Sequence, residues 1–134
     1  MMKIILPITM FLFLAGCCGA PAMNGNNVPT EKIIGAYQGT LPCADCAGIS
    51  TELTLNGDQT FALKETYLKD SKTLATSATG RWQRHDDVVE LFPTTNEANV
   101  RLCYGISSAK TLVRYDISCA PIRGTTLNYS LEKQ

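Results

Sequence analysis

Apolar residues recur at every second position along much of this chain, in short segments that turn residues separate. Ile49, Leu53 and Leu55 alternate with polar side chains, and Phe61 and Leu63 resume the alternation after an Asn-Gly-Asp turn. Successive side chains of a β-strand point to opposite faces, so this period predicts strands with one buried face. The turn between the two segments predicts a β-hairpin.

Further segments of the same kind follow at a spacing of roughly ten residues, which suits an antiparallel meander. After residue 16, no segment keeps a helical period for three turns. We therefore predict an all-β fold, a small antiparallel meander barrel with Trp82 inside, because closing the sheet removes its exposed edges. A β-sandwich is the alternative. The expected strands cover residues 36–41, 49–55, 61–64, 79–83, 88–92, 100–104, 112–117 and 127–131.

The N-terminal segment is typical of a secretory signal rather than of a membrane span. Lys3 precedes an apolar run, Ile4 to Leu14, that is shorter than the about 20 residues a spanning helix needs. The run ends in Leu-Ala-Gly-Cys17, which resembles a bacterial lipobox. We predict that residues 1–16 are removed and that Cys17 receives a diacylglyceryl group and fatty acyl chains such as palmitate. An ordinary secreted protein is the alternative.

The residues after Cys17 predict a membrane-anchored domain on a tether. Gly, Pro and Asn dominate the stretch that follows, without a strand or helix period, so residues 17–34 are expected to be a lipidated tether and 35–134 the domain. Cys18, rather than Asp, stands after the lipidated residue. By analogy with enterobacterial lipoprotein sorting, this predicts lipid anchoring in the outer membrane, facing either the periplasm or the surface.

Charge and composition exclude several function classes. Twelve basic and twelve acidic residues cancel, which argues against nucleic-acid binding. His85 is the only histidine, so a zinc site with two imidazoles is excluded, and no Gly-rich phosphate loop occurs. His85, Asp86 and Asp87 are adjacent and are expected to form a solvated turn. We predict a protein that is not an enzyme and has no catalytic residues.

The cysteines carry most of the remaining information. The bacterial periplasm is oxidising, so disulfides are expected. Cys43, Cys46, Cys103 and Cys119 allow three pairings, of which the local one joins Cys43 to Cys46 and Cys103 to Cys119. Cys103 falls on the polar side of its strand, so a bulge or a strand end must intervene before it can reach Cys119. Cys18 is left without a partner.

The Cys43–Cys46 loop has three interpretations. A disulfide that stiffens the loop is favoured, with Pro42 ending the strand, Asp45 turning the backbone through its side chain and Gly48 taking a conformation that other residues resist. As thiolates, the two cysteines would instead be soft ligands for copper(I), the only cofactor or metal that the sequence suggests. A thioredoxin-like redox pair is the third, although it normally needs a helix N-terminus.

The stretch from Gly39 to Ile49, with Leu-Pro-Cys-Ala-Asp-Cys-Ala-Gly-Ile, resembles the N-terminal domain of the NlpE family. These are bacterial outer-membrane lipoproteins that are often linked to copper homeostasis. Residues 65–68, 79–82 and 127–132 resemble later strands of that domain. The resemblance implies a lipocalin-like β-barrel. Longer members are associated with surface sensing, copper and an envelope stress response, but they carry a second domain that is not expected here.

Several function classes remain open at this point. The first is a non-enzymatic envelope lipoprotein that binds or senses and is linked to copper or to envelope stress. Its expected partners are the membrane, through the N-terminal lipid, and an unidentified envelope protein. The second is an inhibitor or adhesin-like barrel that acts on an external protein such as a lysozyme. Carriage of a lipid or small hydrophobe inside the barrel is a third. Arg101 and Arg114 are expected to face each other across a hairpin as surface charges.

Overall fold

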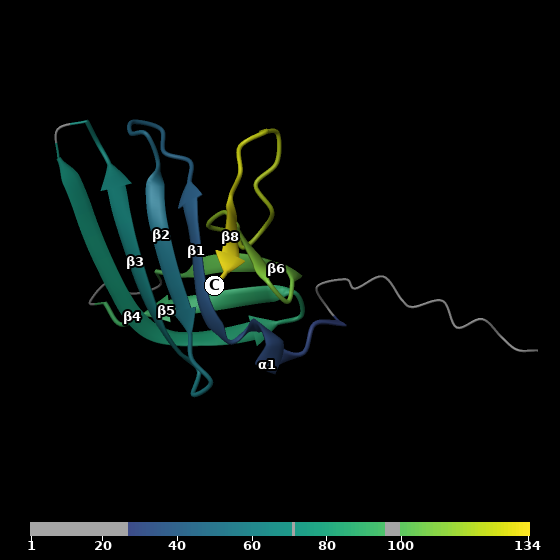
Figure 1. Ribbon diagram of the computed structural model, residues 1–134. Helices are drawn as coiled ribbons and strands as arrows, with labels where there is room; N and C mark the ends of the chain where they lie inside the picture. The colour runs from purple at the N-terminus through teal and green to yellow at the C-terminus, as the bar shows by residue number, and fades with distance from the viewer. Residues whose placement is uncertain (1–26, 71, 96–99) are drawn as a thin grey trace, which may run out of the picture.

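The computed structural model describes residues 27–70, 72–95 and 100–134. Within them, eight antiparallel strands form a closed barrel in sequence order, with the last strand paired to the first (Figure 1). The all-β meander barrel is therefore confirmed. The strands are β1 (Gly35–Leu41), β2 (Ile49–Leu55), β3 (Thr60–Leu68), β4 (Thr73–His85), β5 (Val88–Pro93), β6 (Leu102–Ser108), β7 (Thr111–Arg114) and β8 (Ser130–Lys133).

The period-two pattern corresponds to burial inside the barrel. In β2, Thr51, Leu53 and Leu55 are buried, and Phe61 and Leu63 of β3 continue the same inner face. Trp82 is the largest fully buried side chain, at 1% exposure, which confirms its predicted place inside. Its indole Nε1–H donates to the carbonyl of Asn56 at 3.0 Å, so the one polar atom of the ring is satisfied.

The folded body begins before the residues expected to start the domain. A single helical turn, α1 (Thr30–Ile33), precedes β1, and the side chains of Val28 and Ile33 are buried in the core. Arg84 donates to the carbonyl of Val28, and the hydroxyl of Tyr37 donates to the carbonyl of Ile33 at 2.7 Å. These hydrogen bonds hold the segment against the barrel. Burial of the Val28 and Ile33 side chains also favours this position, because both would otherwise expose apolar surface to water.

The remaining N-terminal predictions, the signal peptide 1–16, Cys17 and Cys18, lie outside the described residues. Among the residues that are described, no helix has the length and hydrophobicity needed to cross a membrane.

Five strands differ from their predicted bounds by more than one residue. β3 runs on to Leu68, and β6 begins at Leu102 and runs on to Ser108. β4 begins at Thr73 rather than near Thr79, because pairing with β3 extends it through a stretch without apolar alternation. β7 ends at Arg114 instead of continuing to Ile117, which is 94% exposed, and β8 begins at Ser130 rather than at Leu127. These two corrections share a cause, an intervening loop that leaves the barrel wall.

The loop after β7 leaves the sheet at a turn that Asp116 organises. Its carboxylate accepts hydrogen bonds from the backbone N–H groups of Ser118 and Ala120, at 2.8 and 3.0 Å, and from the Ser118 hydroxyl at 2.6 Å. The hydroxyl contact, followed by these N–H groups, lowers the pKa of Asp116. An Asx-type turn of this kind competes with strand continuation, which explains why the alternation at Ile117 does not predict burial.

Replacing a core leucine should destabilise the barrel far more than replacing an accessible one on the same inner face. Leu53→Ala removes a fully buried side chain, so we expect a loss of about 2–5 kcal/mol in the free energy of unfolding. Leu74→Ala in β4, at a position that is 60% exposed, is the matched control and should cost less than about 0.5 kcal/mol. Urea denaturation measures both; equal losses would contradict the assignment of the core.

Candidate functional site

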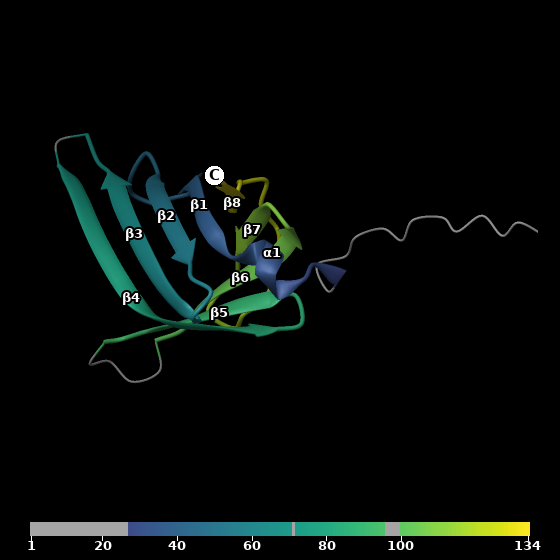
Figure 2. The same ribbon diagram turned by 60° about the horizontal axis from the view of Figure 1, so that its bottom comes forward.

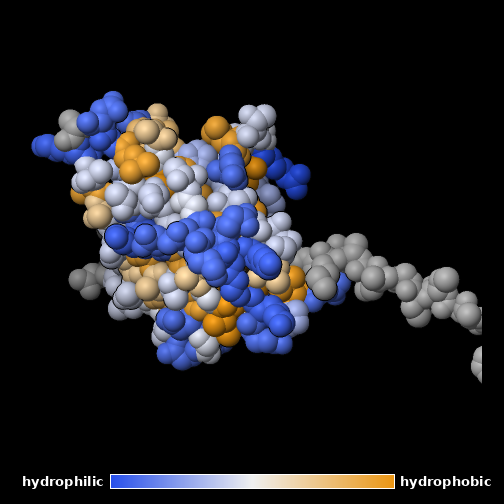
Figure 3. All heavy atoms as spheres, viewed as in Figure 1, coloured by the Kyte–Doolittle hydropathy of each residue, from blue (hydrophilic) through white to orange (hydrophobic). Residues whose placement is uncertain are grey.

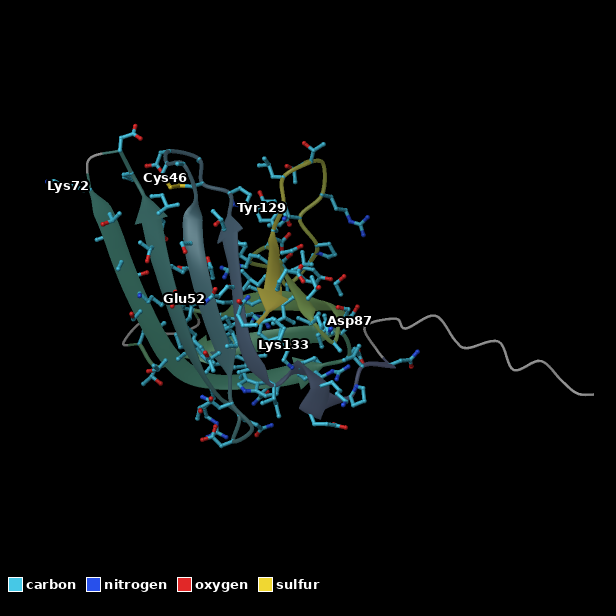
Figure 4. All side chains as sticks on the ribbon, viewed as in Figure 1. Cys46, Glu52, Lys72, Asp87, Tyr129 and Lys133 are labelled. Carbon is cyan, nitrogen blue, oxygen red and sulfur yellow. A yellow bond between two sulfur atoms is a disulfide. The ribbon has the colours of Figure 1, made fainter. Side chains whose placement is uncertain are left out.

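The loop that carries Cys43 and Cys46 lies at the end of the barrel opposite to α1. It follows β1, whereas α1 precedes β1, and a strand of seven residues separates the two by about 20 Å. Figure 4 shows Cys46 at the top of the barrel, and Figure 1 shows α1 at the bottom. One end of the barrel therefore carries the cysteine loop, and the other carries α1.

Cys43 and Cys46 form a disulfide with their Cα atoms 5.3 Å apart, and both residues are half-buried. The loop is also held from the side by the end of β3. The N–H of Ala47 donates to the carbonyl of Leu68 at 3.0 Å, and the N–H of Leu68 donates to the carbonyl of Gly48 at 2.9 Å. The disulfide is thus part of a fixed corner between β1, β2 and β3.

Asp45 and Gly48 act differently from the sequence-based expectation. The Asp45 carboxylate forms an ion pair with Lys69 at 3.2 Å, so it links the loop to the chain beyond β3 rather than turning its own backbone. Gly48 does not have a positive φ, and its reason is space: a Cβ there would lie 2.6 Å from Cγ2 of Thr40. Close packing of the loop against β1, not backbone freedom, explains this glycine.

The three side chains of Cys43, Asp45 and Cys46 also form a compact donor set. One ligand atom from each lies within 4.8 Å of the others. In the disulfide form the sulfurs carry no thiolate charge, so they do not fit a copper(I) ion. Only reduction would provide two soft thiolates and a nearby carboxylate. The redox state therefore decides whether this corner is a structural staple or a metal ligand set.

The second disulfide joins Cys103 of β6 to Cys119, with their Cα atoms 5.2 Å apart. By strand parity alone, Cys103 and Cys119 would point to opposite faces of the sheet. They can meet because β7 ends at Arg114 and Cys119 lies in the turn that follows, with a φ of 60°. Cys103 is only 2% exposed although it faces outward. The loop that carries Tyr115 covers it, and the Tyr115 ring lies where a Cβ of Gly105 would be.

The predicted place of Arg114 is wrong. Arg101 faces outward and pairs with Glu90 at 3.4 Å, whereas Arg114 points into the barrel, where Nη1 donates to the hydroxyl of Tyr104 at 3.1 Å. The two arginines therefore do not face each other. The signal was present in the sequence, since Arg114 shares strand parity with Leu112, which is fully buried. His85 and Asp86 lie exposed in the turn between β4 and β5, as expected.

The comparison with known sequences agrees with this geometry. Residues 37–125, which include both disulfides, match the NlpE N-terminal domain. The chain belongs to the NlpE N-terminal domain family. This NlpE-family barrel is 34% identical over 98 residues to lipoprotein NlpE of Escherichia coli K12, covering 72% of this chain and 39% of that protein.

A second relative is also a lipoprotein by name. The 17 kDa lipoprotein of Treponema pallidum is 42% identical over 65 residues, covering 47% of this chain and 42% of that protein. This chain thus spans about two fifths of the length of both curated relatives.

Solved structures extend the comparison. A candidate lipoprotein from Shewanella oneidensis has a TM-score of 0.63 at 26% identity, covering 82% of this chain and 94% of that one. The structure of the Cpx pathway activator NlpE from Escherichia coli has a TM-score of 0.57 at 32% identity, covering 75% of this chain and 50% of that one.

The two disulfides should differ in their contribution to stability. The chain-entropy relation gives about 2 kcal/mol for the short Cys43–Cys46 loop and about 3 kcal/mol for the Cys103–Cys119 loop. We expect Cys43→Ser with Cys46→Ser to lower the free energy of unfolding less than Cys103→Ala with Cys119→Ala, while both keep a β-type circular dichroism spectrum. A larger loss from the first pair would contradict the account.

Thiol labelling tests the state of the first pair directly. In protein isolated without reductant, Cys43 and Cys46 should resist labelling and should not bind copper(I). If both cysteines label freely and bind copper(I) tightly, and the double serine variant loses that binding, the structural interpretation is wrong.

Proposed function

We propose that this chain is a non-enzymatic, lipid-anchored envelope module that signals stress through the end of the barrel that carries Cys43 and Cys46. Three observations support the proposal: the lipobox that ends at Cys17, the membership of the NlpE N-terminal domain family, and the lipoprotein names of its relatives. The Escherichia coli relative of known structure is called a Cpx pathway activator, and this suggests the class of signal.

The attachment of the N-terminal segment carries the argument. Residues from Val28 to Ile33 pack on the α1 end of the barrel, so the chain leads toward Cys17 from that end. The eleven residues from Cys17 to Val28 reach at most about 40 Å, and they join the anchor to the α1 end. The Cys43–Cys46 end is then the one available to an envelope partner. Figure 2 shows the same separation of α1 from the tips of β3 and β4 after rotation.

The proposal also covers the membrane that holds the anchor and a role for copper(I). Cys18 after the lipidated residue favours the outer membrane. Copper(I) would be a second signal only when Cys43 and Cys46 are reduced, because the disulfide has no thiolate to offer. The disulfide form and the copper(I)-bound form of the Cys43–Cys46 pair would then exclude each other.

Anchoring is tested at the N-terminus. Mass spectrometry of the membrane-extracted protein should show a chain that begins at acylated Cys17. A free terminus further along, such as Ala20 or Ala22, would reject the anchor and with it the orientation of the barrel.

Signalling is tested with two variants that make the same charge change at opposite ends. In cells that carry an envelope stress reporter, overproduction of the chain should induce the reporter. Asp45→Lys should lower the induction several-fold, whereas Glu31→Lys in α1 should not. Both sites are exposed, and an exposed ion pair contributes only about 0–1 kcal/mol, so folding should be retained. Equal responses would contradict the proposal; inhibition of an added lysozyme with a silent reporter would favour the inhibitor class.

A further inference from the structure

The first half of β4 has a neighbouring strand on one side only. β3 pairs with β4 from Thr73 to Arg81, whereas the pairing of β4 with β5 begins at Gly80. Figures 1 and 2 both show the first half of β4 at the outside of the molecule. Pairing of β1 with β8 closes the barrel, but it leaves the edge from Thr73 to Ser77 without a second strand among the described residues.

One hydrogen bond identifies the backbone groups on this open side. The carbonyl of Thr79 accepts from the N–H of Thr94 at 2.8 Å, so Thr79 directs its backbone groups away from β3. Successive residues of a strand in an antiparallel pair alternate in this respect, so the other odd-numbered residues of the first half of β4 do the same. The N–H and carbonyl groups of Thr73, Ala75 and Ser77 therefore point toward no strand in the described part of the chain.

The side chains of this edge lack the features that usually protect a free edge. The sequence from Thr73 to Thr79, Thr-Leu-Ala-Thr-Ser-Ala-Thr, has no charged residue and no proline, and its register with β3 is regular. Leu74, on the inner face, is 60% exposed. Figure 3 shows hydrophilic residues at the tip of β3 and β4 and paler ones along the side below it, where Figure 1 places β4. Charges, prolines or bulges normally keep an edge from pairing, so an edge without them can bind a strand.

The position and the chemistry of the edge indicate what binds there. Thr73 pairs with Leu68, whose backbone also holds the Cys43–Cys46 loop, so the edge begins at the end of the barrel that we assign to recognition. A second copy is disfavoured, because two-fold pairing of this edge with itself would be antiparallel and would direct the two α1 ends, with their anchors, in opposite directions. An uncharged ligand is favoured, because the edge places no side chain of opposite charge across from a charged one.

We propose that the edge from Thr73 to Ser77 binds an extended, uncharged segment of an envelope partner as an additional strand of the sheet. Backbone hydrogen bonds to the outward groups of the edge hold the segment, and an apolar side chain opposite Leu74 covers that exposed residue. This inference rests on the proposed signalling function, for which it names the kind of partner. It does not involve the sulfur atoms of the Cys43–Cys46 loop.

NMR titration with a defined strand peptide tests the proposal. The protein is the secreted chain with Cys17→Ser, which retains every described residue. The peptide is acetyl-Thr-Val-Thr-Val-Thr-amide, which places hydroxyl and apolar side chains on opposite faces of a strand. The amide signals of Thr73, Ala75 and Ser77 should shift saturably to lower field, because these N–H groups gain acceptors, whereas the signal of Leu53 in β2 should not shift. The absence of a saturable shift would overturn the proposal.

Two methylated peptides separate strand addition from simple apolar contact. One carries a methyl group on the nitrogen of its central Thr, and the other carries it on the nitrogen of the preceding Val. A strand directs successive N–H groups to opposite sides, so only one of the two peptides has lost a donor toward β4. That peptide should bind roughly tenfold more weakly than the other, because a hydrogen bond is lost. Equal affinities would overturn the proposal, and this comparison needs no variant of the protein.

A substitution in the edge provides the matching test on the protein. Ala75→Pro removes one outward N–H and leaves the ladder with β3 in place, whereas Ala75→Thr keeps that N–H and is the control. Ala75→Pro should lose peptide binding and Ala75→Thr should retain it, with the emission of buried Trp82 unchanged in both. Peptide binding that persists in Ala75→Pro would overturn the proposal. If Ala75→Pro loses the Trp82 emission, the methylated peptides decide.

Sedimentation of the same protein without peptide tests the alternative occupant. The chain should sediment as a monomer at the concentrations used for the titration. A dimer that Ala75→Pro dissociates and Ala75→Thr does not would assign the edge to a second copy, and the proposal would be wrong.

Cells that carry the envelope stress reporter separate this inference from the proposed function. Ala75→Pro should lower the induction several-fold, and Ala75→Thr should not. If Ala75→Pro induces the reporter like the unmodified chain while Asp45→Lys does not, strand addition is wrong and the signalling function stands. If Asp45→Lys and Glu31→Lys respond equally, it is the signalling function that fails.

Discussion

Pairing between the first and last strands is the contact on which the rest of the structure depends. β8 is only four residues long, and Gln38 and Tyr37 of β1 pair with its Glu132 and Lys133. The approach is close because Gly39 has no side chain: a Cβ there would meet the backbone carbonyl of Ser130 and the side chain of Leu131. Closing the sheet removes its two edges and turns one face of every strand toward a shared interior.

Closure also gives the barrel two unlike ends. At one end, α1 and Val28 cover the core, and Lys133 of the closing strand donates to the carbonyl of Lys32 at 2.6 Å. The other end carries the Cys43–Cys46 corner and the exposed side chain of Leu74. A lipid anchor that leads from the first end leaves the second for recognition. The proposal on signalling follows from this asymmetry.

The sequence predicts those parts of the fold in which burial alone decides the pattern. Buried and accessible side chains alternate along β2 and the start of β3, because one face of each strand is packed and the other is solvated. Trp82 is buried for the same reason. Prediction fails where another contact decides. The first half of β4 forms only by pairing with β3, Cys103 is buried on the outer face by a loop, and Arg114 turns inward toward Tyr104. Each of these depends on residues far away in the chain, which a local period does not report.

Amide hydrogen exchange of β1 and β8 tests closure most directly. The N–H of Gln134 donates to the carbonyl of Ala36 at 2.9 Å, and the pairs at Tyr37 and Gln38 continue this ladder. The amides of Glu132 and Gln134 face β1, whereas that of Lys133 donates to Lys110 on the β7 side. If the barrel is closed, the amides of Glu132 and Gln134 exchange as slowly as those of the central strand β2, through opening of the whole fold. Exchange of these amides orders of magnitude faster than that of Leu53 would show an open edge, and it would contradict the account of a closed barrel with two distinct ends.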